Sequence, residues 1–504
     1  MTHAQPSTLL DLIRRVPADR TAIIVPEGPI RITYGALARQ VEDVANALTA
    51  LGVGPGDRVG SALPNGLSTV VCFLAASMAG TAAPLNPAYR EEEFKFYLED
   101  TNAKVLLVPA EGADAARKAA GDSIPVITVS MDAHGTVHLD GVSARKPFAP
   151  PSVTSPALIL HTSGSTGRPK RVPLSHANLT ISASNVARTY DLTGDDVSLC
   201  VMPLFHVHGL VASTLATLAT GGTVVVPAKF SPLAFWRTAH EHGATWYSAV
   251  PTLHQLLLAR AQPGAAKPAG AEKLRFIRSC SASLPPQVMH DLEAAFGAPV
   301  LEAYGMTEAA HQMSSNPLPP REHKAGSVGP ATGIEISIQD ANWNHLPRGE
   351  RGEVCIKGPN VVEGYESNPE ANATSFKDGW FRTGDQGFLD DEGYLTLVGR
   401  LKEMINRGGE KISPREIDEV LVTHPKVAEA VCFGVSHPTW GEEVEACVVL
   451  KEPVSEQELL AYCKERLADF KRPKKIHITD AIPRTATGKI QRRVVAEVYA
   501  KASA

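Results

Sequence analysis

Apolar and polar positions along the first 300 residues follow two patterns. Short apolar runs, as at residues 105–108 and 157–160, are typical of buried strands. Between such runs lie stretches with helical periodicity, as at residues 90–98 and 177–189. Because strands alternate with helices, we expect an α/β fold in which helices cover parallel-type sheets.

The pattern changes in the last third of the chain. Residues 352–357 and 393–398 belong to a β-rich, turn-rich stretch that ends near residue 400. A compact α+β unit of about 100 residues follows, which is an ordinary domain size. We therefore expect an N-terminal domain over residues 1–399 that includes a β-rich subdomain, a short joint at 400–403, and a small C-terminal domain over residues 404–504.

The expected C-terminal domain contains clear helix and strand signals. Ser413 and Glu416 predict a capping box, with Pro414 at the first helical position. A second helix is predicted after its cap at Ser455. Three further runs predict strands, at residues 428–435, 445–450 and 475–478.

Composition narrows the class of protein. The chain has 504 residues, 43% of them apolar and 20% charged, as in ordinary globular proteins. Its net charge of -5 gives no global field that favours nucleic acid or an anionic membrane, so we expect neither partner. The longest apolar window, residues 70–83, is too short to span a bilayer, so we expect no membrane insertion. Oligomeric state cannot be predicted from these features.

The seven cysteines are scattered, with no Cys-x-x-Cys pair and no Cys/His cluster at zinc spacing. They resemble small buried residues in a reducing compartment. The N-terminus lacks the features of a secretory signal. We expect a cytoplasmic enzyme.

Residues 161–172 combine four hydroxyls, two glycines and three cations between two predicted strands. Glycines allow backbone N–H groups to approach a polyphosphate, hydroxyls donate further hydrogen bonds, and Lys170 supplies charge. A solvated turn is the alternative. The spacing does not fit the phosphate loop of nucleoside triphosphatases, which needs Gly-Lys-Ser/Thr at the start of a helix.

Three further stretches carry candidate chemistry. Glu308 follows a predicted strand and precedes a helical pattern, which suits either a magnesium site or a stabilised helix N-terminus. Asp385 at a glycine turn can accept two ribose hydroxyls, although turn aspartates are usually structural. Lys489 lies in a Thr/Gly loop, where its compact charge can bridge two anions; most loop lysines have no catalytic role.

Together, these stretches resemble the signature motifs of the adenylate-forming enzymes over nearly the whole chain. That family includes acyl-CoA synthetases, peptide-synthetase adenylation domains and firefly luciferase. The matching stretches are residues 162–170, 304–308, 383–385, 399–402 and 483–489.

The resemblance implies an ATP-dependent, AMP-forming acid–thiol ligase that uses ATP, Mg²⁺ and coenzyme A. A carboxylate attacks the α-phosphate of ATP to give acyl-adenylate and pyrophosphate, and a thiol then displaces AMP. By this resemblance, Lys489 neutralises the reacting anions, Glu308 holds magnesium and Thr307 contacts the α-phosphate. Asp385 and Arg400 hold the ribose. The other implied nucleotide contacts are Thr162, Ser163, Gly164, Ser165, Thr166, Gly167, Lys170, Ser281, Ala282, Ser283, Ala303, Tyr304 and Gly305.

The resemblance also implies a mobile C-terminal domain. Lys402 matches the hinge about which this domain rotates between the two half-reactions. After the rotation, Lys489 leaves the site and a second group of residues lines the tunnel for the pantetheine of coenzyme A. This second group is Gly408, Gly409, Glu410 and Lys411.

One position departs from the family pattern. The phosphate loop usually continues Lys-Gly-Val, but Arg171 replaces the glycine here. Arginine adds bulk and charge, which puts the flexibility of the chain after Lys170 in question.

Residues 201–209, 278–283 and 308–317 are similar to the oxalate-CoA ligases in particular. His206, Ser281 and His311 offer hydrogen-bond donors for a second carboxylate, whereas a fatty or aryl acid prefers apolar walls. We count His206 among the catalytic candidates as well. If the segment after Glu308 is helical, His311 projects from the same face. For His208 we expect a core role.

A small carboxylic acid, with oxalate as first choice, is therefore the expected substrate. The alternatives are a malonate, aryl or medium-chain acyl-CoA ligase, an adenylating module that loads a carrier protein, and a non-catalytic relative. The complete set of motifs argues against the last of these.

Overall fold

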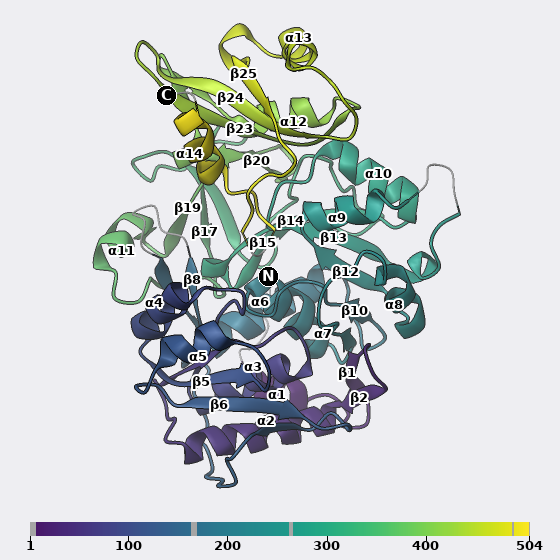
Figure 1. The fold of residues 1–504 in the computed structure, drawn as a ribbon, viewed down its shortest axis with the longest axis vertical. Helices are drawn as coiled ribbons and strands as arrows, with labels where there is room; N and C mark the ends of the chain where they lie inside the picture. The colour runs from purple at the N-terminus through teal and green to yellow at the C-terminus, as the bar shows by residue number, and fades with distance from the viewer. Residues whose placement is uncertain (1–6, 163–168, 262–265, 486–487, 503–504) are drawn as a thin grey trace.

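The computed structural model describes residues 7–162, 169–261, 266–485 and 488–502. These residues form four sheets (Figure 1). In Figure 1, the first large sheet lies in the lower part, the second extends up the right side to the height of the β-rich sheet on the left, and the yellow-green C-terminal domain lies at the top. The expected α/β fold, with its β-rich subdomain and small α+β C-terminal domain, is confirmed.

The first large sheet is parallel at its centre and antiparallel at both edges. The parallel pairs run from β6 (Val126–Met131) to β8 (Pro156–Thr162). The complete order is β7 (Val137–Leu139), β6, β5 (Ala103–Pro109), β3 (Arg58–Ser61), β4 (Thr81–Pro84), β8 and β9 (Lys170–Ser175). The edge strand β9 pairs with β8, so the predicted phosphate loop connects two strands, as expected.

The second large sheet has the same design. Its order is β15 (His311–Ser315), β14 (Val300–Met306), β13 (Phe276–Cys280), β12 (Trp246–Ala249), β10 (Val197–Leu199), β11 (Thr223–Val225), β1 (Thr21–Val25) and β2 (Ile30–Thr33). The strands from β14 to β1 are parallel, and β15 and β2 are antiparallel edges. Ligands of such sheets bind beyond the carboxyl ends of the parallel strands.

Helices fill the space between and around these sheets. The helix α3 (Leu67–Ala79) is apolar all round and almost fully buried, and it packs against β4 and β8. A π-helix over His208–Leu215 continues as α7 (Ala216–Ala219). The remaining helices are α1 (Leu9–Arg14), α2 (Tyr34–Ala50), α4 (Glu91–Thr101), α5 (Asp114–Ala120), α6 (His176–Thr189), α8 (Phe235–His242), α9 (Pro251–Leu258), α10 (Pro286–Phe296) and α11 (Pro369–Ser375).

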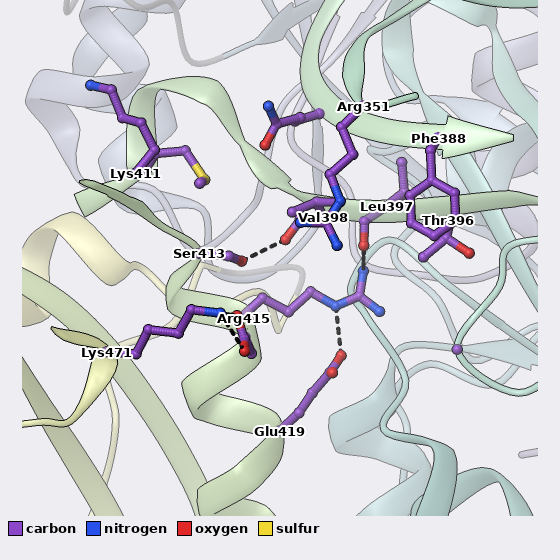
Figure 2. A pocket seen from close by; sticks show the side chains of 14 residues that line it. Arg351, Phe388, Thr396, Leu397, Val398, Lys411, Ser413, Arg415, Glu419 and Lys471 are labelled. Carbon is purple, nitrogen blue, oxygen red and sulfur yellow. Dashed lines mark hydrogen bonds and ion pairs between the residues drawn. The ribbon is translucent and has the colours of Figure 1, made fainter. Parts of the chain in front are cut away.

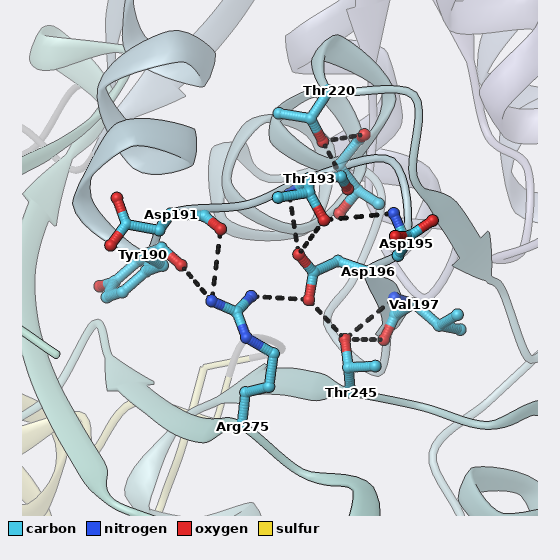
Figure 3. Close-up of polar contacts among 10 residues, drawn as sticks. Tyr190, Asp191, Thr193, Asp195, Asp196, Val197, Thr220, Thr245 and Arg275 are labelled. Atoms are coloured by element: carbon cyan, nitrogen blue, oxygen red, sulfur yellow. Dashed lines mark hydrogen bonds and ion pairs between the residues drawn. The ribbon is translucent and has the colours of Figure 1, made fainter. Parts of the chain in front are cut away.

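A polar network fixes the amino ends of the second large sheet (Figure 3). Arg275 forms an ion pair with Asp196 at 2.7 Å, and its other Nη donates to the carbonyls of Tyr190 and Asp191. Thr245 donates to the same Asp196 carboxylate at 2.8 Å. The network holds the end of α6 against the amino ends of three strands. It leaves the carboxyl ends of these strands available for a site.

The β-rich sheet runs in the order β16 (Glu335–Gln339), β17 (Gly352–Lys357), β19 (Trp380–Leu389) and β18 (Phe376–Lys377), and β20 (Leu395–Arg400) pairs with β19. The C-terminal sheet runs in the order β22 (Glu410–Ile412), β21 (Ile405–Arg407), β24 (Gly441–Leu450) and β23 (Val427–His437), and β25 (Lys475–Ile478) pairs with β24. The C-terminal helices are α12 (Pro414–Val422), α13 (Glu456–Arg466) and α14 (Arg492–Ala502).

The capping box predicted at the start of α12 is wrong. The Ser413 hydroxyl donates to the carbonyl of Val398 in β20 at 2.6 Å and makes no cap hydrogen bond. Glu416 instead pairs with Lys471 at 2.7 Å. Tertiary contacts therefore take both side chains. Ser455 does cap α13, accepting a hydrogen bond from the N–H of Glu458.

Within the described residues, no helix combines the length and the apolar character that crossing a bilayer requires.

Candidate active site

The carboxyl ends of β13 and β14 bring two candidate stretches to the same edge of the second large sheet. These strands are parallel, and Cys280 pairs with Ala303. Ser281, Ala282 and Ser283 follow β13 directly, and Tyr304 and Gly305 belong to the end of β14. Ser281 has a φ of 74°, in the left-handed region that side chains rarely adopt. The Ser283 hydroxyl lacks a partner among the described residues, so it is free to meet a ligand.

Glu308 is buried in a short 3₁₀ turn, Thr307–Ala309, directly after β14. Its Oε1 accepts hydrogen bonds from the Tyr365 hydroxyl at 2.9 Å and from Thr162 Oγ1 at 3.3 Å. The other carboxylate oxygen has no protein donor among the described residues. Thr307 is buried beside Glu308.

The helix predicted after Glu308 is wrong. Ala310 has a φ of 50°, and the chain reverses into β15, which pairs back onto β14. His311 therefore opposes Met306 across the sheet and does not share a helix face with Glu308. Gly305 is needed here, since a Cβ at this position would overlap the His311 carbonyl.

Asp385 and Arg400 are neighbours on the paired strands β19 and β20. Arg400 Nε lies 3.0 Å from Asp385 Oδ1, and the Tyr304 hydroxyl donates to Asp385 Oδ2. The carboxylate is buried, whereas the Arg400 side chain is 43% exposed. One wall thus holds an anchored carboxylate beside an accessible cation.

Lys489 reaches this wall from the C-terminal domain. A yellow segment in Figure 1 descends from that domain toward β14 and β15. Within it, Gly488 has a φ of 82° and packs on Thr252 and Val250 of the N-terminal domain. Burial and the charge of Arg400 lower the pKa of Lys489 below its usual range, while the nearby carboxylates oppose this shift.

Buried polar side chains lie beside the same strand ends. His208 contacts Ser281 Oγ at 3.0 Å and Ser248 Oγ at 2.6 Å, so it has the core role expected of it. His311 lies with Nδ1 3.4 Å from Arg278 Nη2, and its ring centre is 5.1 Å from that of His208. Burial lowers the pKa of His311 well below its usual value, and Arg278 adds to this. Burial, with Lys489 nearby, lowers the pKa of His206 to about 3.

The predicted phosphate loop lies partly outside the described residues. Ser163, Gly164, Ser165, Thr166 and Gly167 belong to the undescribed stretch. The residues that flank it are described: Thr162 touches Glu308, and the Lys170 ammonium sits 4.4 Å from the centre of the Tyr365 ring.

The structure does not bring the expected tunnel residues to this site. Gly408 and Gly409 form the turn between β21 and β22, and Gly408 packs against Trp440. Glu410 is exposed on β22. Lys411 lines a separate cavity of about 470 Å³ between the β-rich sheet and the C-terminal domain (Figure 2). Lys402 lies in the exposed turn Leu401–Glu403 between the two.

Two residues of the site are missing from the sequence prediction. Tyr365 gave no local signal, because its contact with Glu308 arises only from folding. Arg278 could have been found, since it is a charged residue within an otherwise buried strand. It donates to the Tyr190 hydroxyl, Ser248 and Gln312 at 2.9–3.0 Å.

Known proteins resemble this chain over nearly its full length. Residues 11–366 match the family described as AMP-binding enzyme, and residues 416–489 match its C-terminal domain family. A probable CoA ligase of Humulus lupulus, CCL9, is 49% identical over 98% of this chain and 96% of its own. The oxalate–CoA ligase of Arabidopsis thaliana is 48% identical, covering 98% of each chain. That of Saccharomyces cerevisiae is 44% identical, covering 96% of each chain.

Solved structures give the same picture. ATP-bound MatB from Rhodopseudomonas palustris is 32% identical and superposes with a TM-score of 0.90 over 99% of this chain and 100% of that chain. Apo MatB superposes less closely over the same shares, with a TM-score of 0.78. MenE from Bacillus subtilis in complex with ATP and magnesium ion is 31% identical, with a TM-score of 0.84 over 97% of this chain and 99% of that chain.

Proposed function

This chain belongs to the AMP-binding enzymes and is an AMP-forming CoA ligase, and we propose that the acid it activates is oxalate. The observation that carries the site assignment is the proximity of Lys489, from the C-terminal domain, to Arg400, Asp385 and Glu308. The choice of oxalate as the substrate is supported by the relatives named oxalate–CoA ligase and by the polar side chains near these residues.

The first half-reaction must bring a carboxylate anion to the α-phosphate of ATP. Lys489 supplies a positive charge between them, which lowers the repulsion of the two anions in the transition state. Thr307 contacts the same phosphate. These groups act by position and charge and form no covalent intermediate with the acid.

The nucleotide occupies the wall formed by β13, β14 and β19. Asp385 accepts hydrogen bonds from the ribose hydroxyls, and Arg400 donates a hydrogen bond beside it. Tyr304 and Arg400 hold the Asp385 carboxylate in position for this contact. The free hydroxyl of Ser283 and the backbone around Ala282 and Ala303 border the nucleotide. The loop that includes Lys170 holds the β- and γ-phosphates.

Glu308 fits a magnesium ion. Mg²⁺ is usually bound by one or two carboxylates together with substrate phosphates and waters, so a single buried carboxylate suffices. Two hydroxyls hold Oε1 of Glu308 and leave the other oxygen for the ion. When bound, the ion neutralises phosphate charge; Thr162 and Tyr365 orient the carboxylate that holds it.

The acid lies near His206, Ser281 and His311. His206 and His311 have strongly lowered pKa values, so each imidazole is neutral and offers one N–H to an anion. A second carboxylate finds donors here, whereas a long alkyl chain would strand these polar groups without partners. This difference favours oxalate over medium-chain or aryl acids.

The second half-reaction needs a different domain orientation. We place the N-terminal domain at residues 1–399, the hinge at 400–403 around Lys402, and the mobile domain at 404–504. Rotation withdraws Lys489 and brings Gly408, Gly409, Glu410 and Lys411 to the pantetheine of coenzyme A. The cytoplasmic location expected from the sequence stays a prediction.

Turnover of oxalate, glycolate, malonate, hexanoate and 4-coumarate at matched concentration tests the substrate. We expect kcat/KM for oxalate to exceed the others by at least about tenfold, because unpaired polar groups discriminate strongly. A preference for hexanoate or 4-coumarate contradicts the oxalate assignment, and a preference for malonate replaces oxalate with a longer diacid.

A further inference from the structure

Arg171 lies in a cluster of charged and polar side chains on the β8–β9 hairpin. The phosphate loop connects the two strands of this hairpin. The cluster contains Arg171, His161, Asp100, Glu366 and Arg58. Its members come from four separate parts of the chain: β3, α4, the paired strands β8 and β9, and the segment before α11. The catalytic assignments above do not use any of them.

One side of the cluster ties both hairpin strands to the end of α4. His161 and Arg171 are directly opposite each other in the β8–β9 register. His161 Nε2 lies 2.9 Å and Arg171 Nη1 3.1 Å from the same oxygen of Asp100. Asp100 sits in the last turn of α4, where the helix dipole disfavours an anion. Burial lowers the pKa of His161 and so favours its neutral form. Arg171 therefore supplies the positive charge beside the Asp100 carboxylate.

The other side of the cluster ties β9 to Glu366. Arg171 Nε lies 3.3 Å from Glu366 Oε2, and the Glu366 N–H donates to the Arg171 carbonyl at 3.0 Å. Arg58 contacts the remaining carboxylate oxygen of Glu366. Arg171 therefore sits between two carboxylates: its Nη1 lies beside Asp100, and its Nε is within ion-pair distance of Glu366 but makes no hydrogen bond to the described residues.

The two residues next to this connection point to the phosphate side of the site. Lys170 precedes Arg171, and Tyr365 precedes Glu366. The Lys170 ammonium packs on the Tyr365 ring at 4.4 Å, and the Tyr365 hydroxyl donates to Glu308 Oε1 at 2.9 Å. Holding Arg171 against Glu366 thus fixes the relative positions of Lys170, Tyr365 and Glu308.

We propose that Arg171 is a positioning residue for ATP and its metal ion: by bridging Asp100 and Glu366, it holds Lys170 and the Tyr365–Glu308 pair in place before the nucleotide binds. This inference rests on the proposed function. It also answers the question that the sequence raised about flexibility, because the arginine adds a brace to the chain after Lys170. Its positive charge pairs with two protein carboxylates and not with phosphate.

Arg171→Gln tests the proposal, since it leaves a polar side chain without charge that is too short to connect both carboxylates. We expect the Kd for MgATP, measured by calorimetric titration without acid, and the KM for ATP to rise about five- to twentyfold, because small misplacements of binding groups are costly. Conversion of preformed acyl-adenylate with coenzyme A should change by less than about twofold, because acyl-adenylate carries no β- or γ-phosphate. Arg171→Lys should lie in between, since it keeps the charge but lacks the two separate nitrogens that lie beside Asp100 and Glu366.

Arg145→Gln is the matched control. Arg145 pairs with Asp43 at 2.7 Å on the surface and touches nothing of the site, so its MgATP affinity should equal that of wild type. A double-mutant cycle with Glu366→Gln should be non-additive.

Two results would overturn the proposal. One is unchanged MgATP affinity and KM in Arg171→Gln. The other is an equal loss in ATP binding and in acyl-adenylate conversion with a lowered Tm, which would mark a merely structural ion pair. Failure of wild type to use oxalate would count against the proposed function alone, because the calorimetric comparison contains no acid.

Discussion

In the proposed mechanism, the first half-reaction depends on Lys489. It lies in a loop of the small domain, is partly buried, and is close enough to Arg400, Asp385 and Glu308 for their charges to affect its pKa. By this proposal, its charge lowers the repulsion between the two anions that react. Its effect should therefore be confined to the step in which phosphate is attacked.

Lys489→Ala should lower the rate of acid-dependent pyrophosphate release by about two to three decades, as for loss of one preorganised electrostatic group. Thioester formation from preformed acyl-adenylate should fall by less than about threefold. Single-turnover assays of each half-reaction measure this. Lys464→Ala, on an exposed face of α13, is the control and should match wild type. Equal losses in both half-reactions would refute the assigned role.

Glu302, on β14, gives a pH-dependent prediction. Its Oε1 accepts the Leu284 N–H at 2.9 Å, its Oε2 has no hydrogen-bond partner among the described residues, and burial raises its pKa to about 7 against the opposing charge of Arg415. A folded-state pKa above the unfolded value means that the folded protein binds the proton more tightly. This contribution to stability is complete below about pH 4.5 and is lost as pH rises through about 7.

Glu302→Gln mimics the protonated form at every pH. The Tm of the variant relative to wild type should therefore rise between about pH 5.5 and about pH 8.5, with a difference in unfolding free energy approaching about 2–3 kcal/mol. Thermal unfolding at a series of pH values measures it, with exposed Glu465→Gln as the control. A difference that does not change with pH would show that Glu302 is already ionised in the folded protein.

At the scale of elements, the reversal after Glu308 decides where His311, a proposed acid-binding residue, lies. The sequence predicts a helix here because Glu308 and His311 have helical spacing. Ala310 enters the left-handed region instead, and β15 gains a full antiparallel ladder with β14. Pairing with a sheet edge depends on residues far away in the chain, so local periodicity could not reveal it.

The sequence predicts the large elements well for a related reason. Strands such as residues 475–478 and 352–357 are found with the expected bounds, because each is a short apolar run between polar turns. Arg278 and Tyr365 are different, since their roles come from contacts between strands and loops that local patterns do not encode. Asp385 and Lys489 could be predicted from the sequence only because their motifs resemble those of a known family.

The loop that carries Lys489 must dock on the N-terminal domain through Gly488. A side chain at this position would meet Thr252 and Val250 at 3.1–3.2 Å, and a φ of 82° is already unfavourable for other residues. Gly488→Ala should lower acid-dependent pyrophosphate release by about tenfold or more and spare the second half-reaction.

Gly393→Ala is the control for Gly488→Ala, because Gly393 also has a positive φ, of 84°, but lies in the β19–β20 turn with nothing nearer than 3.9 Å. Its backbone strain is the same and its activity should be unchanged. If both variants lose activity equally, docking of the Lys489 loop is not the cause.

At the scale of the whole molecule, we propose that the orientation of the two domains is the one used in the first half-reaction. Lys489 is near the other candidate site residues, Gly408 and Gly409 are away from them, and the fit to MatB is closer for the ATP-bound form, with a TM-score of 0.90 against 0.78. The proposal includes a second orientation for attack by the thiol. We propose the exposed turn Leu401–Glu403, which contains Lys402, as the hinge between the two orientations.

Lys402→Pro tests this rotation. Proline fixes φ near about −65° and should restrict the hinge. Thioester formation should fall by at least about tenfold, while acid-dependent pyrophosphate release stays within about threefold of wild type. Lys402→Ala should leave both steps near wild type, because no side-chain chemistry is assigned there. Full activity of the proline variant would move the hinge elsewhere.

The products formed from ATP, coenzyme A and oxalate by the wild-type protein test the central claim most directly. Chromatography of the nucleotides and thioesters should show one AMP and one pyrophosphate for each oxalyl-CoA, with neither formed when oxalate is omitted. ADP in place of AMP would contradict the AMP-forming chemistry, and absence of oxalyl-CoA while another acid is converted would contradict the assignment of oxalate.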